Sequence, residues 1–244
     1  MSPDELESIE RATVAAVAPA RVMELPGWVL ALDQGTIGRA HSAAPFSLEM
    51  TADAVPRIEA LYAEAGLSPV WRIGDEPGHE PIRVALSERG YRPDTPTLLK
   101  TGSIARMIAA FRGAPAELID APDADWAAVF TGEGFDPEDG FNRVAAFTRS
   151  PGALYGRVRD GARTVAVGVM SFHGGWASIH GMRTAQDRRG EGAAGRILAT
   201  LAAEAQARGV AKVFLQVTEE NPARGLYRRF GFERRRRYWY WRKA

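Results

Sequence analysis

A run of glycines leads directly into a stretch with the periodicity of an amphipathic helix. From residue 196 onward, apolar residues recur at helical spacing until Gly209, which supplies a stop signal. Glycines leave the backbone amides of a helix start uncovered, and such amides bind anions together with the positive end of the helix dipole. The sequence therefore predicts a helix over 193–208 whose N-terminus cradles a pyrophosphate. The residues of this predicted cradle are Arg189, Gly190, Glu191, Gly192, Ala193, Ala194 and Gly195.

A second motif follows about thirty residues later in the chain. Asn221 precedes Pro222, a combination typical of an N-cap and a first helical position, so a short helix is predicted from there. This helix carries Tyr227, and Gly231-Phe232 ends it. A phosphate cradle beside a phenolic proton donor indicates group transfer from a phosphate-bearing carrier.

Composition limits the possible classes of protein. With 244 residues, 45% of them apolar and 25% charged, the chain can form one large domain or two small ones. No apolar run approaches the ~20 residues that span a bilayer, and the acidic segment 1–10 lacks the hydrophobic core of a secretory signal. The absence of cysteine excludes disulfides, thiolate zinc sites and a cysteine nucleophile. We therefore expect a cytoplasmic protein with no metal and no membrane partner.

The predicted elements describe an α/β protein with a mixed, twisted sheet flanked by helices. Alternating apolar residues predict strands, and helical spacing predicts helices, on both sides of the cradle. The predicted strands cover 153–158, 164–172, 176–184, 213–217 and 232 onward, and the predicted upstream helices cover 124–130 and 138–150.

The N-terminal half repeats this order in a weaker form. Residues 65–73 parallel 208–216 as helix, glycine stop and strand, and residues 86–91 parallel 227–232. Helix–glycine–strand is also a common arrangement that can recur by chance. If the repeat is a duplication, the first copy has lost its function, because 47–51 has no glycine where the cradle should be and Leu86 stands where Tyr227 should be. We expect a degenerate lobe over 1–108 and a catalytic domain over 109–244.

The glycine run allows two other interpretations. Residues 190–195 fit G-x-G-x-x-G, which predicts a dinucleotide-binding turn and an NAD(P)-dependent oxidoreductase. That turn normally follows a strand end directly and opens its domain, whereas here residues 185–189 and several strands come first. The run could also be a purely structural turn into a helix.

Both motifs resemble those of one enzyme family. Arg189-x-x-Gly192-x-Ala194 matches the Q/R-x-x-G-x-G/A signature of GCN5-related N-acetyltransferases (GNAT), and the segment from Asn221 to Phe232 is similar to the last motif of that family. In this chain Asn221 stands one residue nearer to Tyr227 than in the usual pattern. The specific resemblance covers 165–232, while the N-terminal half resembles two-lobed bacterial members more loosely. The resemblance implies the acyl-CoA N-acyltransferase fold, with two GNAT-like lobes.

The resemblance also implies roles for individual residues. Acetyl-CoA would lie in a V between strands 176–184 and 211–217, with its pantetheine against the backbone of Met182, Arg183 and Thr184. Its pyrophosphate would bind the cradle, Asn221 would contact the co-substrate, and Tyr227 would protonate the departing thiolate. A phenol, whose ordinary pKa is about 10, stays protonated at neutral pH and can act as this acid.

The base that removes the amine proton has several candidates. His180 precedes Met182 by two residues, so a regular strand would place both side chains on one face. Its ordinary pKa of about 6.5 suits the deprotonation of an amine. Glu219, Glu220 or a chain of water molecules are alternatives, and both glutamates could instead complement a helix dipole.

The C-terminal run of four arginines, 234–237, followed by Tyr-Trp-Tyr-Trp admits a nucleic-acid interpretation. On a strand, however, alternate residues face opposite sides, so half of the arginines would be in solvent and half of the aromatic rings in the core. The net charge of +1 also provides no wider basic footprint. We expect no nucleic-acid partner.

These patterns together predict an N-acetyltransferase that moves an acetyl group from acetyl-CoA to a primary amine by direct attack. The acceptor would be a small-molecule amine, a peptide N-terminus or a lysine. A non-catalytic acyl-CoA-binding module is a further alternative, although Tyr227 argues against it.

Overall fold

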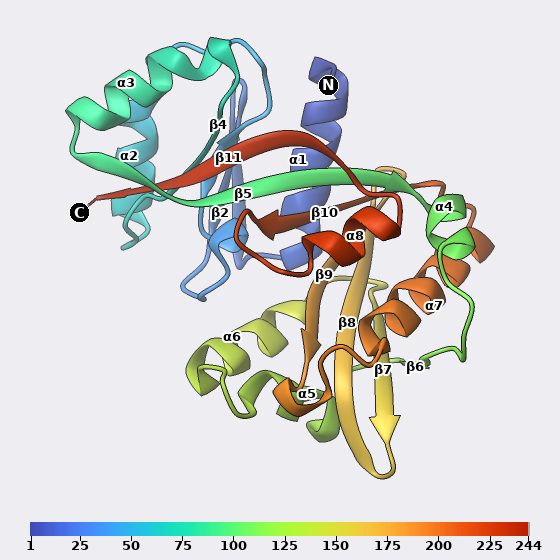
Figure 1. The fold of residues 1–244 in the computed structure, drawn as a ribbon. Coiled ribbons are helices and arrows are strands. Elements are labelled where there is room, and N and C mark those ends of the chain that lie inside the picture. The colour runs from blue at the N-terminus through green and yellow to red at the C-terminus, as the bar shows by residue number, and fades with distance from the viewer. Residues whose placement is uncertain (244) are drawn as a thin grey trace.

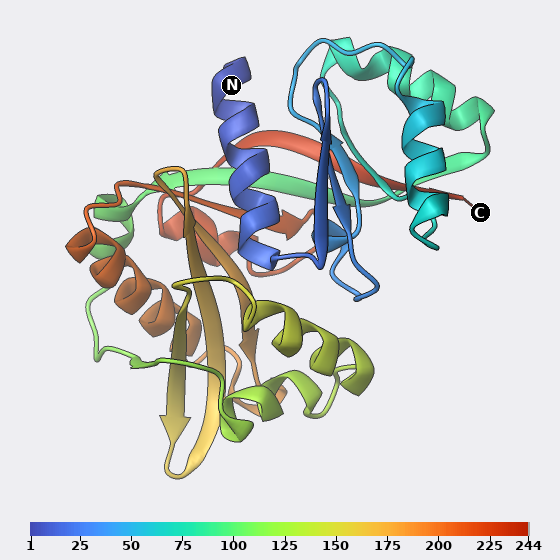
Figure 2. The same cartoon turned by 180° about the vertical axis from the view of Figure 1, so that it is seen from behind.

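The computed structural model describes residues 1–243 and shows one eleven-stranded mixed sheet with helices on both faces (Figures 1 and 2). Its helices are α1 (Pro3–Val17), α2 (Val55–Glu64), α3 (Glu80–Glu88), α4 (Ile104–Ala109), α5 (Ala124–Thr131), α6 (Pro137–Phe147), α7 (Ala193–Ala207) and α8 (Arg224–Arg229), with short 3-10 turns η1 (Gly38–Ala40), η2 (Pro77–His79) and η3 (Gln186–Arg188). Its strands are β1 (Arg21–Leu25), β2 (Trp28–Leu32), β3 (Ala43–Pro45), β4 (Trp71–Gly74), β5 (Tyr91–Ser103), β6 (Glu117–Ile119), β7 (Leu154–Asp160), β8 (Arg163–His173), β9 (Trp176–Thr184), β10 (Lys212–Thr218) and β11 (Glu233–Lys243).

The mixed α/β sheet expected from the sequence is confirmed, and the bounds of the elements predicted after residue 123 agree within two or three residues. β9 matches its predicted range, and α7 ends one residue before its predicted end. The last helix starts later than predicted, at Arg224 instead of Pro222, because residues 222–223 form a turn. The strand β6 and the helix α4 were not predicted, and neither were α1 and β1–β3 in the N-terminal half.

The strand order is symmetric about the centre of the sheet. It runs β1-β2-β3-β4-β11-β5-β10-β9-β8-β7-β6. The strands β1–β5 correspond in order to β7–β11. With this correspondence, the sheet has the same strand order when it is read from β1 inward and from β7 inward. The parallel pair β3–β4 also corresponds to the parallel pair β9–β10. The repeat expected from the sequence thus has a counterpart in the topology of the sheet.

Two long strands cross between the halves of the chain. β5 pairs with β10, and β11 pairs with both β5 and β4. In Figure 1 these two strands run side by side across the whole molecule. The two halves therefore share one continuous hydrogen-bonded sheet.

Separate apolar clusters fill the faces of the sheet. The largest lies beneath α7 and α8 and includes Ile197, Leu201, Leu215 and Tyr227. A second cluster around Trp71 fills the N-terminal half, and a third packs α5 and α6 against β7 and β8. In residues 1–243 no helix is both long and apolar enough to cross a bilayer.

The C-terminal arginine run joins the halves through buried ion pairs. Arg236 is 3% exposed and bonds to Glu10 of α1 at 2.8 Å and to Glu76 at 2.8 Å. Glu10 also pairs with the buried Arg72. The expected strict alternation along this strand is wrong, because bulges near Arg235 and Trp239 interrupt it.

Candidate functional site

The strands β9 and β10 are paired along only part of their length. Parallel pairing runs from Lys212↔Trp176 to Leu215↔Ile179 and stops there. β9 nevertheless stays paired with β8 as far as Thr184, and β10 stays paired with β5 as far as Thr218. Beyond the divergence each strand has an unpaired edge that faces the other. The V expected between these strands is confirmed.

A bulge lies at the point of divergence. His180 is opposite Val169 and Arg183 is opposite Val167, so β9 carries one extra residue there. Gly181 has a φ of +60°, a left-handed conformation that glycine adopts without strain. The bulge reverses the expected orientation of two side chains, because His180 contacts Phe147 of α6 whereas Met182 packs into the cluster beneath α7. The prediction that His180 and Met182 share a face is wrong for this reason.

His180 is enclosed on the α6 face. Its side chain is 5% exposed, its Nε2 lies 2.9 Å from Ser171 Oγ, and its ring lies 5.1 Å from that of Phe147. Ser171 Oγ in turn bonds to Ser150 Oγ at 2.9 Å. Burial, and secondarily the charge of Arg39, lowers the pKa of His180 well below its ordinary value. The ring is therefore neutral and weakly basic in the folded protein.

The neutral His180 makes stability depend on pH. Below about pH 6.5 the unfolded chain binds a proton at this histidine whereas the folded chain does not, so stability falls as pH falls. Between pH 6 and pH 5, the unfolding free energy of the wild-type protein should fall by about 1 kcal/mol more than that of His180→Gln. Denaturant titrations at both pH values measure it, with the exposed His173→Gln as control. An unchanged pH slope in His180→Gln would show that the folded protein holds a protonated ring.

The predicted cradle forms the turn into α7. Gly190 and Gly192 have φ values of +88° and +85°, and a Cβ at either position would meet no atom within 4 Å. The amides of Gly190, Glu191 and Gly192 have no acceptor among residues 1–243, and no side chain caps α7. The first amides of α7 also lack intrahelical acceptors. The turn thus presents an uncovered row of N–H groups to solvent.

The arginines around the cradle differ in their partners. Arg188 pairs with Asp160 at 2.8 Å, and Arg196 donates to the carbonyls of Ala114 and Pro115. Arg189 is exposed, and its one hydrogen-bond acceptor within the described chain is the Thr184 carbonyl at 3.5 Å. Arg189 is therefore the guanidinium at this turn that is available to an anion.

Tyr227 lies on α8 with its ring in the cluster beneath α7 and α8. The residue is 8% exposed and its ring meets that of Phe232 edge to face at 6.0 Å. No hydrogen-bond partner for its hydroxyl exists among the described residues, yet the oxygen is not fully buried. Burial raises the pKa of Tyr227 to about 12. The hydroxyl therefore remains protonated and can still donate.

Asn221 holds the turn that leads into α8. Its Oδ1 accepts a hydrogen bond from the Ala223 amide at 2.8 Å. This contact ties the side chain to its own loop two residues ahead, as in an Asx turn. The side-chain NH₂ group keeps its two donors free of partners within residues 1–243.

Sequence reasoning missed a cationic group beside the divergence, on the α6 face. Asp139 of α6 accepts from Arg143 at 2.6 Å, from Arg183 at 3.1 Å and from Thr36 at 2.6 Å. The partly buried Arg39 of η1 has no carboxylate partner in the described chain. Three guanidiniums thus accompany one carboxylate. Nothing in the local sequence of η1 could have indicated this.

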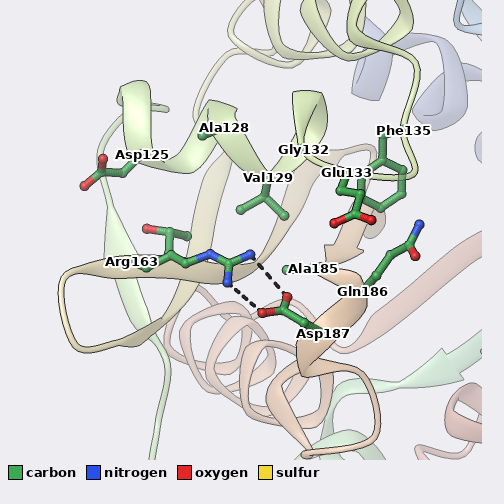
Figure 3. A pocket seen from close by; sticks show the side chains of 11 residues that line it. Asp125, Ala128, Val129, Gly132, Glu133, Phe135, Arg163, Ala185, Gln186 and Asp187 are labelled. Carbon is green, nitrogen blue, oxygen red and sulfur yellow. Dashed lines mark hydrogen bonds and ion pairs between the residues drawn. The ribbon is translucent and has the colours of Figure 1, made fainter.

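A polar cavity of about 330 Å³ lies next to the turn η3 (Figure 3). Its wall comes from α5, the α5–α6 loop, the start of β8 and η3, and the ion pair Arg163–Asp187 spans it at 2.7 Å. Asp125 and Glu133 also line it, so carboxylates outnumber guanidiniums. The cavity thus favours a cationic group over a phosphate, and no cradle residue lines it.

Comparison with known proteins identifies the family. The family model described as "Probable histone acetyltransferase Rv0428c C-terminal" matches residues 4–241. The chain belongs to this family. It is also 26% identical over 243 residues to the uncharacterized N-acetyltransferase YobR of Bacillus subtilis strain 168, covering 94% of this chain and 95% of that protein.

Solved structures share the fold over nearly the whole chain. A GCN5-related N-acetyltransferase from Kribbella flavida superposes with a TM-score of 0.73 at 16% identity, covering 98% of this chain and 95% of that one. A tandem GNAT protein from the clavulanic acid biosynthesis pathway gives a TM-score of 0.58 at 15% identity, with coverage of 98% and 94%. The predicted membership of the GNAT superfamily and its acyltransferase fold are confirmed, and the chain is an acetyltransferase of the GNAT type.

Proposed function

We propose that this protein transfers the acetyl group of acetyl-CoA to a primary amine by direct attack, without a covalent enzyme intermediate. The observation that carries the proposal is the divergence of β9 and β10, with the cradle and Tyr227 on neighbouring elements. Acetyl-CoA supplies an activated thioester carbonyl.

Each part of the site has a task in this reaction. The unpaired edge of Met182, Arg183 and Thr184 adds the pantetheine as a strand and thereby orients the thioester. The amides of the cradle, with Arg189, hold the pyrophosphate, and the free donors of Asn221 reach the same co-substrate. Tyr227 donates its proton to the sulfur as the carbon–sulfur bond breaks.

Two features of the site bear on the amine proton. One is the candidate base that accepts it, and the other is the cationic surroundings, which favour an amine that is already neutral. His180 stays a candidate base, but its neutral, buried ring binds a proton poorly. Glu219 is engaged with Arg237, which leaves the exposed Glu220 or a chain of water molecules as the other routes. The cationic group around Arg39 favours a neutral amine over an ammonium ion, because like charges disfavour the protonated form.

The acceptor class is tested by measuring CoA release with a panel of amines, amino acids, peptides with free N-termini and lysine peptides. Turnover with a primary amine and none with its N,N-dimethyl analogue is expected. Tight binding of acetyl-CoA without turnover of any amine would favour the acyl-CoA-binding module. Binding of NAD in place of acetyl-CoA, measured by calorimetry, would favour the oxidoreductase.

We further propose that 1–108 forms a degenerate lobe and 109–244 the catalytic domain, with β5 and β11 exchanged between them. The segment 47–51, which corresponds to the cradle, has no glycine, and its Glu49 is acidic. One acetyl-CoA per chain is therefore expected in a calorimetric titration. A stoichiometry of two would contradict the asymmetry between the halves.

A further inference from the structure

A basic pocket of about 410 Å³ lies between α8, β5 and β11. Its charged lining residues are Lys100, Arg224, Arg228, Arg234 and one acid, Glu220. No residue of the cradle lines it, although Asn221 stands on its wall. The pocket is therefore distinct from the pyrophosphate site, and it adjoins the loop before α8 that carries Asn221.

Residues of like charge are neighbours in two separate pairs on the wall of this pocket. Lys100 and Arg234 are direct Cα partners on the adjacent strands β5 and β11, a position where like charges destabilise a sheet. Arg224 and Arg228 stand four residues apart on α8, where like charges destabilise a helix. The fold thus brings four cations together although the repulsion within each pair destabilises the sheet and the helix that carry them.

None of these four cations pairs with a carboxylate in residues 1–243. The neighbours of Arg234 along β11 behave differently, because Arg235 pairs with Glu5, Arg236 with Glu10, and Arg237 with Glu219. The missing carboxylates are therefore a property of the pocket and not of the arginine run.

Lys100 is the most constrained of the four. It is 8% exposed, and among the described residues its ammonium finds one acceptor, the Phe232 carbonyl at 3.5 Å. Burial, followed by the charges of Arg224 and Arg228, lowers the pKa of Lys100. Buried ammonium groups in proteins are nearly always paired with an anion, whereas Lys100 has one long contact to a carbonyl and no carboxylate partner in residues 1–243.

We propose that this pocket binds a phosphate group. A phosphate dianion offers several acceptor oxygens, which match two or three guanidiniums and one ammonium. The phosphate can come from the 3′-phosphate of CoA, in which case the inference rests on the proposed function, or from a separate phosphorylated ligand.

The test compares Arg228→Gln with Arg229→Gln, because both residues are exposed arginines of α8 and Arg229 does not line the pocket. Pyrophosphate binding is measured by calorimetry at fixed ionic strength. Arg228→Gln and Lys100→Met should each weaken it about tenfold or more, as expected for the loss of a hydrogen bond to a charged group. Arg229→Gln should change it less than twofold. Because the cradle also offers amides to pyrophosphate, the series is repeated with Gly192→Asp, in which binding at the pocket should persist.

A second series compares acetyl-CoA with its 3′-dephospho analogue. If removal of the phosphate weakens binding to wild type but not to Arg228→Gln, the phosphate is that of CoA. If removal of the 3′-phosphate weakens binding to wild type and to Arg228→Gln equally, the 3′-phosphate does not contact Arg228. The pyrophosphate result then assigns the pocket to a separate phosphorylated ligand. Pyrophosphate affinity that Arg228→Gln leaves unchanged, or that Arg229→Gln reduces as much, would overturn the proposal. Failure of acetyl-CoA to bind at all would refute the proposed function and leave the pyrophosphate result intact.

Discussion

Replacing Tyr227 with Phe is expected to lower turnover by about 10²–10⁴, the usual contribution of one general acid. The ring packing against Phe232 remains, and no hydrogen bond within residues 1–243 is lost, because the hydroxyl has no partner there. The affinity for acetyl-CoA and the thermal stability should therefore barely change. Steady-state rates of CoA release, with binding measured separately, provide the test.

The choice of acyl donor distinguishes acid catalysis from positioning. A donor whose leaving thiol has a lower pKa departs without protonation, so the loss caused by Tyr227→Phe should shrink with that donor. A loss of equal size with both donors would assign Tyr227 to positioning. Full activity of the variant would make it a packing residue.

Gly192→Asp is expected to abolish measurable binding of acetyl-CoA, a loss of at least about 10²-fold. A carboxylate at the start of α7 repels the pyrophosphate and obstructs its approach to the backbone amides. Each hydrogen bond from such an amide to a charged group is worth about 1.5–3 kcal/mol. Gly192→Asn is the matched control, because Asn and Asp both tolerate the left-handed backbone at φ +85° and have similar shapes. Asn should weaken binding by only about tenfold.

Calorimetry with acetyl-CoA measures both variants, and melting curves establish that they are folded. Equal losses in the Asp and Asn variants would show that shape rather than charge matters at this turn. Unchanged affinity in a folded Gly192→Asp variant would exclude the cradle as the pyrophosphate site.

Local patterns predicted the elements that build the site. The helical spacing before Gly209 specified α7, and the Gly174-Gly175 turn marked the start of β9, because both signals lie within a few neighbouring residues. The divergence of β9 and β10 came from the family resemblance and not from the residues themselves. The tasks of the individual site residues stay predictions.

Features that depend on distant residues could not be read in the same way. Gly181 within a strand pattern was a usable sign of a bulge, and with it the opposite orientations of His180 and Met182 could have been inferred. The sequence could not show which of the four arginines is buried, because the partners of Arg236, Glu10 and Glu76, lie far away in the sequence. The lack of a carboxylate partner for Arg39 within residues 1–243 likewise depends on how elements from both halves of the chain pack together.

The pairing of β5 and β11 with strands from both halves of the chain also has a consequence for synthesis of the protein. The strands that pair with β5 begin at Lys212 and Glu233, so β5 leaves the ribosome long before either partner exists. Synthesis proceeds at about 5–20 residues per second, and during that interval β5 and β4 present open edges on which other chains can pair. Among the strands of residues 1–243, β11 is synthesised last, yet it takes a place in the middle of the sheet. Loss of the 11 residues of β11 would therefore remove an internal strand instead of a fraying tail.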